Sequence, residues 1–154
     1  MLECGVKIVA VPYLAKTYVN GAVRWIGSNP VIIMSDRNAY ADFFWFALLH
    51  EICHVLKHGK KYACVAFEES VRCFEKPVQE LEADEFAAEF FISKNDLELF
   101  THNKARPSDA EIREFAKKCL VPYYIVVGRL GHEHIISWSD PIASSRPKLK
   151  ILTA

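Results

Sequence analysis

The sequence predicts an α+β fold, in which a small N-terminal three-stranded sheet packs on a mainly helical domain. Runs of alternating, β-branched residues come first, segments with helical apolar spacing follow, and the two kinds are not interleaved. With 154 residues, of which 51% are hydrophobic, the chain has the size of one domain with its own core. We therefore expect a single domain over residues 1–143. Residues 144–154, rich in Ser, Pro and Lys, are expected to form a loosely ordered tail.

The three strands come from the first part of the chain. Residues 6–11 alternate and stop at Pro12, while residues 21–26 and 31–34 flank the turn signal Gly27-Ser28-Asn29-Pro30. Short strands of this kind predict a small antiparallel or mixed sheet.

Helices follow, and each is marked by a boundary residue. They are expected at residues 42–59 with Gly59 as C-cap, 78–91 after Pro77, 94–100 after the N-cap Ser93, 109–119 after a capping box from Ser108 to Glu111, and 122–130 before Gly131. The first is apolar nearly all round, so we expect it to be buried.

This first helix carries an H-E-x-x-H motif, His50-Glu51-Ile52-Cys53-His54. Four residues along an α-helix place two side chains about 40° apart and about one turn from each other, close enough to share a metal ion. Imidazole nitrogens suit zinc, and Glu51 would point to the side where a coordinated water lies. Because zinc lowers the pKa of that water to about 7, Glu51 needs only to finish its deprotonation. The motif predicts one Zn²⁺ ion as cofactor and Glu51 as general base.

Two histidines and a water leave tetrahedral zinc one protein ligand short. Glu80, on the second predicted helix, is the expected third ligand. Asp84, one turn further on, is placed to accept the spare N–H of a ligand histidine. Glu82 is the alternative third ligand, about 200° round the helix from Glu80.

Two residues near the motif could be mistaken for ligands. His58 continues the four-residue spacing, but it lies another turn away, and we expect it to be exposed to solvent. Cys53 faces away from the shared imidazole side, so core packing is its expected role. The chain has five cysteines at irregular spacings, an odd count that favours reduced thiols.

Charge and hydropathy argue against two classes of function. The 19 acidic and 19 basic residues give zero net charge with no basic stripe, so direct nucleic-acid binding lacks its electrostatic footprint. No apolar run reaches about 18 residues, and residues 1–4 show no signal-peptide pattern. We expect a cytoplasmic protein that neither enters a membrane nor binds nucleic acid directly.

The motif region resembles a known family. Residues 44–59, followed by residues 80–88, are similar to the ImmA/IrrE family of metallopeptidases, most of all to the form often found behind an Xre-type helix-turn-helix domain. Further matches lie at residues 21–25, 30–35 and 126–130. The resemblance covers most of residues 5–140. The family's second helix usually runs into a proline, where this chain has Ser93, and its usual Leu-Gln-His is Leu130-Gly131-His132 here.

The resemblance implies a gluzincin-like (zincin) fold and a zinc peptidase that cuts or otherwise inactivates repressor partners. Such proteins belong to prokaryotic stress responses, prophages, conjugative elements and toxin-antitoxin loci. By position, His50 and His54 match the family's metal histidines, Glu51 its general base and Glu80 its metal carboxylate. The helix-turn-helix domain would need far more chain than stands before Val6, so we expect any DNA-binding partner to be a separate polypeptide.

Two functions follow as hypotheses. The first is a zinc-dependent endopeptidase that hydrolyses a peptide bond in a repressor or antitoxin-like protein, with Glu51 activating a zinc-bound water. The alternative is a metal-binding regulatory or toxin-antitoxin component that acts by protein–protein interaction without cutting. A peptidase also needs a donor for the developing oxyanion. Spacing does not choose among the candidates Tyr62, His102, Tyr123, Tyr124, His132 and His134.

Overall fold

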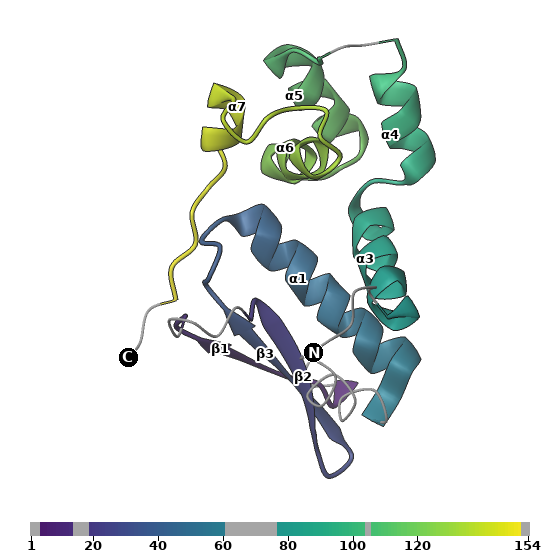
Figure 1. The fold of residues 1–154 in the computed structure, drawn as a ribbon, viewed down its shortest axis with the longest axis vertical. Coiled ribbons are helices and arrows are strands. Elements are labelled where there is room, and N and C mark those ends of the chain that lie inside the picture. Colours follow the sequence, from purple (N-terminus) through teal and green to yellow (C-terminus); the bar gives the residue numbers. More distant parts are fainter. Residues whose placement is uncertain (1–3, 14–18, 61–76, 104–105, 152–154) are drawn as a thin grey trace.

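The computed structural model describes residues 4–13, 19–60, 77–103 and 106–151. In chain order the elements are β1 (Lys7–Val11), β2 (Gly21–Ile26), β3 (Asn29–Ser35), α1 (Ala41–Cys53), the π-helix η2 (His54–His58), α3 (Val78–Phe91), α4 (Lys94–Thr101), α5 (Asp109–Lys118), α6 (Tyr123–His132) and α7 (Pro141–Ser144). Strands come first and helices follow, which is the predicted α+β fold (Figure 1). No helix among the described residues is long and apolar enough to cross a membrane.

The sheet is mixed and has β3 in its centre. β1 pairs with β3 in parallel, and β2 pairs with β3 antiparallel. Ile32 and Met34 of β3 have no exposed surface, because α1 packs on them. Gly27 lies in the turn between β2 and β3 at a φ of 61°, a conformation that glycine adopts without strain.

One face of the sheet is covered by α1, which carries the motif (Figure 1). Leu48 packs on Ile32 and Met34, and Phe44 and Ile52 extend this contact at helical spacing. The expected burial of the whole helix is wrong, since Trp45 is 42% exposed and Leu56 is 69% exposed. These residues lie on the sides of the α1–η2 segment that the sheet and the other described helices leave open.

The α4, α5 and α6 helices form a second core above α1 (Figure 1). Ser93 accepts the backbone N–H of Asp96 at the start of α4, and Ser108 forms the expected capping box with Glu111. The predicted end of α6 before Gly131 is wrong. Gly131 is buried within the helix, where an added Cβ would lie 2.5 Å from the Trp138 ring, so this glycine permits a close approach rather than a C-cap.

Residues 145–151 return from α7 to the sheet and contact the start of α1 (Figure 1). Arg146 is buried, donates to Asp42 Oδ2 over 2.6 Å, and stacks on the rings of Tyr40 and Trp138. Main-chain hydrogen bonds join Ala41 to Pro147 and Leu149 to Ala39. These contacts hold residues 146–149 against the domain and do not fit the expectation of a loosely ordered tail. The local sequence did not indicate them, because Asp42, the buried carboxylate that binds Arg146, lies 104 residues away.

Candidate metal centre

The α1–η2 segment and α3 bring His50, His54 and Glu80 together. His50 Nε2 lies 3.0 Å from His54 Nε2. One carboxylate oxygen of Glu80 lies 3.2 Å from His50 Nε2, and the other lies 3.3 Å from His54 Nε2. The three ligand atoms thus face one common point, and each of them is a donor type that zinc accepts.

The spacing of these atoms fits a zinc ion. Ligand atoms about 2.0–2.1 Å from a tetrahedral ion lie roughly 3.3–3.4 Å from one another. The two nitrogens are 3.0 Å apart, and each lies 3.2 or 3.3 Å from a different oxygen of Glu80, which is close to that value. Two imidazole nitrogens and a carboxylate oxygen favour zinc over calcium or magnesium, which prefer sets made of oxygen alone.

Small residues on α3 let the two helices approach closely. Ala83 and Ala87 are completely buried in the α1–α3 contact, where a longer side chain would force the helix axes apart. Since Glu80 lies three and seven residues before them, it sits at the same helix face and reaches the motif.

Asp84 holds the first histidine. His50 Nδ1 lies 2.9 Å from Asp84 Oδ1, which turns Nε2 toward the other two candidate ligands. Burial lowers the pKa of His50, but the carboxylates of Asp84 and Glu80 outweigh it and raise that pKa to about 9. The metal-free imidazole therefore carries a proton at neutral pH, and a metal ion must displace it.

Glu51 is buried against the sheet beside the three candidate ligands. Burial raises its pKa to about 7, although the charge of His50 opposes this shift. Its side chain lies on Gly21 of β2, where an added Cβ would be 2.8 Å from Glu51 Cγ. Residues 21–25 are part of the family resemblance, but the sequence gives Gly21 no role. Only the packing of β2 on α1 reveals its contact with Glu51.

The structure corrects the prediction for His58 and assigns other contacts to Glu82. The His58 side chain is only 7% exposed, because α3 covers this end of the helix. Its Nδ1 lies 2.8 Å from His54 Nδ1, and its Nε2 lies 3.0 Å from Glu82 Oε2. Glu82, the alternative third ligand, also accepts from Lys57 over 2.7 Å and is not part of the three-residue group.

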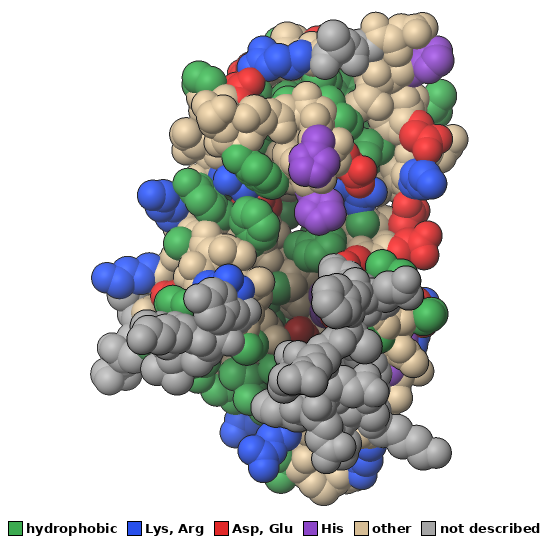
Figure 2. Space-filling model, viewed as in Figure 1, with side chains coloured by type: hydrophobic (Ala, Val, Ile, Leu, Met, Phe, Trp, Pro, Cys, Tyr) green, Lys and Arg blue, Asp and Glu red, His purple; other side chains and the backbone are tan. Residues whose placement is uncertain are grey.

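A cavity of about 250 Å³ opens beside the candidate metal centre. Asp84 lines it, so the cavity begins at the residue that holds His50. Its lining is mostly apolar and comes from α1, α3, α6 and the segments beside them, and it includes the aromatic side chains of Phe43, Phe46, Phe91 and Trp138. Figure 2 shows this face of the molecule hollowed between the upper helices and α1, with hydrophobic side chains at the rim.

Two buried polar atoms belong to residues of the cavity lining. Asp42 Oδ1 and Arg129 Nε have no hydrogen-bond partner among the described residues. Buried polar atoms are normally satisfied by protein, water or a ligand. Both atoms are buried behind the cavity surface, so they do not define which molecule the cavity would hold.

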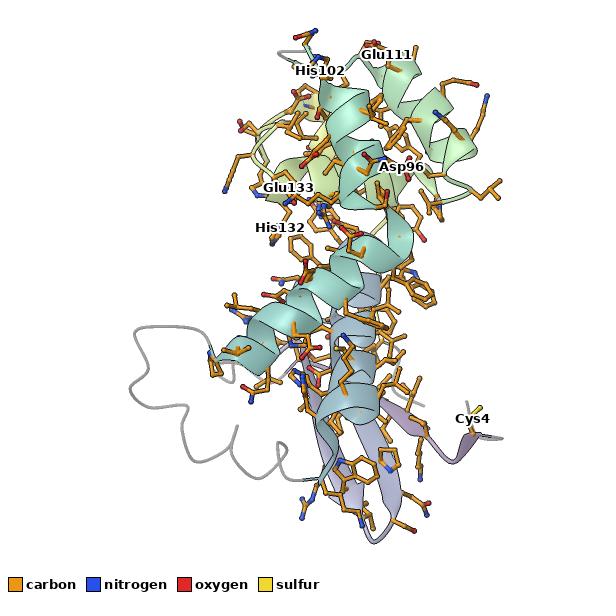
Figure 3. The ribbon with its side chains drawn as sticks, turned by 90° about the vertical axis from the view of Figure 1, so that its right-hand side faces the viewer. Cys4, Asp96, His102, Glu111, His132 and Glu133 are labelled. Atoms are coloured by element: carbon orange, nitrogen blue, oxygen red, sulfur yellow. The ribbon has the colours of Figure 1, made fainter. Side chains whose placement is uncertain are left out.

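The candidate oxyanion donors lie in different parts of the molecule. His132 lines the cavity and stacks on Phe46, with ring centroids 5.9 Å apart. Figure 3 shows His132 at the lower edge of the upper helices, whereas His102 lies at the far tip of α4. His102 thus lies at the opposite end of α4 from the candidate centre (Figure 3), and Tyr62 lies outside the described residues.

Comparison with known families agrees with this geometry. The chain matches the model of the IrrE N-terminal-like domain, a peptidase family, over residues 4–130. It belongs to the ImmA/IrrE family. The match spans both helices of the candidate centre, so this ImmA/IrrE chain has a metallopeptidase-type function. No curated protein gives a match to the chain.

Proposed function

We propose that the protein is a zinc-dependent endopeptidase that hydrolyses a peptide bond in a repressor or antitoxin-like protein partner. The observation that carries the proposal is the convergence of His50, His54 and Glu80 beside a buried carboxylate, Glu51. Zinc bound by these residues supplies a Lewis acid, which polarises a carbonyl group and makes a nearby water more acidic.

Glu51 is suited to carry the proton between the two stages of hydrolysis. A general base works best when its pKa lies near the working pH, and in the metal-free protein burial raises the pKa of Glu51 to about 7. As the carboxylate, Glu51 takes a proton from the attacking water. As the acid, it returns that proton to the leaving nitrogen. Its contact with Gly21 fixes the side chain against the sheet during both transfers.

The neighbouring cavity is suited to hold a substrate side chain next to the bond that is cut. It starts at Asp84, beside His50, and its aromatic walls favour a large apolar side chain. We therefore include a large apolar residue, next to the scissile bond, in the proposal.

The partner class rests on family membership and charge. The resemblance to the ImmA/IrrE family implies an Xre-type repressor as partner, and zero net charge argues against direct contact with nucleic acid. An Xre-type repressor or antitoxin on a separate polypeptide is therefore the proposed substrate. Such a partner lies in the cytoplasm, and we propose the same location for this protein.

The test is cleavage of the product of the adjacent reading frame by zinc-loaded protein, followed by mass spectrometry. We expect defined fragments with the wild type, none with Glu51→Gln, and unchanged cleavage with the control Glu85→Gln, an exposed carboxylate of α3. Zinc content is measured for all three proteins. An intact partner in a stable complex with zinc-loaded wild type would favour the non-cleaving regulatory component instead.

A further inference from the structure

His54 has a hydrogen-bonded chain behind it that runs to the protein surface. Its Nε2 faces the other two candidate ligands, so its Nδ1 points away from them. That Nδ1 lies 2.8 Å from His58 Nδ1. His58 Nε2 lies 3.0 Å from Glu82 Oε2, and Glu82 Oε1 accepts from Lys57 Nζ over 2.7 Å.

The direction of each hydrogen bond in this chain follows from metal binding. When His54 Nε2 gives its lone pair to a metal ion, Nδ1 must carry the proton and donates it to His58 Nδ1. His58 Nδ1 then accepts, so His58 Nε2 carries its proton and donates to Glu82. Both imidazoles are neutral in this arrangement, and Glu82 is the carboxylate acceptor at its end. No atom in the chain needs two incompatible roles.

Burial supports a specific role for His58. With only 7% of its side chain exposed, the ring has lost most of its contact with water, and a buried imidazole without partners is unfavourable. Both of its nitrogens are used in this chain. The backbone is also unusual here, because the π-helix η2 begins at His54 and ends at His58. Single π-helical turns are frequent at functional sites.

We propose that His58 is a positioning residue for the metal ligand His54 and that Glu82 holds His58 in place. The inference rests on the proposed metal site but not on peptide cleavage. His58 would fix the tautomer and the ring orientation of His54, as Asp84 does for His50. One ligand histidine, His50, would then be oriented directly by a carboxylate, Asp84. The other, His54, would be oriented by His58, which is in turn held by the carboxylate of Glu82.

Zinc affinity, measured by competition with a chelator on purified full-length protein, tests this role. We expect His58→Leu to weaken zinc binding about 10- to 100-fold, the usual effect of losing such a partner. His58→Gln should recover most of the affinity, since its amide can accept from His54 and donate to Glu82. Glu82→Ala should weaken binding by a smaller factor, whereas the control Glu85→Ala should leave it unchanged.

Two further readouts separate positioning from a structural role. Thermal unfolding of the metal-free variants reports the fold alone, and the visible spectrum of cobalt-loaded protein reports the ligand geometry. We expect a changed cobalt spectrum for His58→Leu and a wild-type spectrum for His58→Gln. A folded His58→Leu protein with wild-type zinc affinity and cobalt spectrum would overturn the proposal.

If His58→Leu does not fold, Glu82→Ala decides the question, and unchanged zinc affinity in that variant overturns the proposal. Wild-type protein that binds zinc tightly but cuts nothing contradicts the proposed peptidase and leaves this inference standing. Wild-type protein that binds no zinc contradicts both.

Discussion

Gly21 lies so close to Glu51 that an added Cβ would be 2.8 Å from Glu51 Cγ and 3.0 Å from its Oε1. A methyl group at this position must displace the carboxylate that we propose as general base. The contact joins the edge of the sheet to the motif helix, and it makes the position of Glu51 depend on β2.

Replacing Gly21 with alanine should therefore lower activity more than stability. We expect kcat/KM for the cleaved partner to fall about 10- to 100-fold, since a shift of about 1 Å in a catalytic group can cost this much. Zinc affinity should stay near that of the wild type, because the three atoms nearest to an added Cβ all belong to Glu51 and not to a candidate ligand. Ala22→Ser is the matched control, as neighbouring residues of a strand point to opposite faces. Equal activity in Gly21→Ala and the control would show that Glu51 is not held by this contact.

Enlarging the α1–α3 contact should disrupt the centre. Ala83→Leu places extra carbon atoms at a position with no exposed surface, and overpacking of this kind costs about 1–3 kcal/mol of unfolding free energy. We also expect zinc affinity to fall, because α3 carries Glu80 and Asp84 away from the histidines. Urea unfolding and chelator competition measure the two effects. Glu85→Leu, on the exposed side of α3, should alter neither by a comparable amount.

Breaking the buried pair of Asp42 and Arg146 should destabilise the fold. Removing one member leaves an uncompensated buried charge, a loss of about 3–5 kcal/mol. Burial raises the pKa of Asp42 even though Arg146 opposes the shift, so the pair has already paid a desolvation cost. We expect Arg146→Met to lower the urea midpoint strongly and the double variant Asp42→Leu/Arg146→Met to recover part of the loss. Additive effects of the two single substitutions would contradict this coupling.

Asp36 should make stability depend on pH in the acid range. The backbone N–H groups of Tyr13 and Ile151 donate to its carboxylate over 2.8 and 3.1 Å, and they lower its pKa below the ordinary value of 3.8. A carboxyl group whose pKa is lower in the folded state stabilises the fold above the unfolded pKa, and this contribution disappears as pH falls through the folded pKa. Asp36→Asn should thus be less stable than wild type at pH 6–7, with a difference that shrinks below about pH 4. A difference that is constant with pH would refute the assignment.

Much of the fold was predictable because its signals are local. Ser93 and Ser108 begin helices through hydrogen bonds to residues three positions away. The convergence at the centre was also accessible, since the four-residue periods of α1 and α3 place His50 with His54 and Glu80 with Asp84.

The errors arise where distant segments meet. The exposure of His58 depends on α3, which covers the end of the motif helix, and no local pattern reports that. Arg146 was assigned to a loose tail because its partner is remote in the sequence. A glycine packed under Trp138 has the same local signature as a helix C-cap, which explains the misplaced end of α6 at Gly131.

Anomalous scattering at the zinc edge, from crystals of zinc-loaded protein, tests the central claim most directly. We predict a single peak about 2.0–2.1 Å from His50 Nε2, His54 Nε2 and a carboxylate oxygen of Glu80. The peak should vanish in Glu80→Ala crystals prepared under the same conditions. A peak at other residues, or none between α1 and α3, would contradict the account.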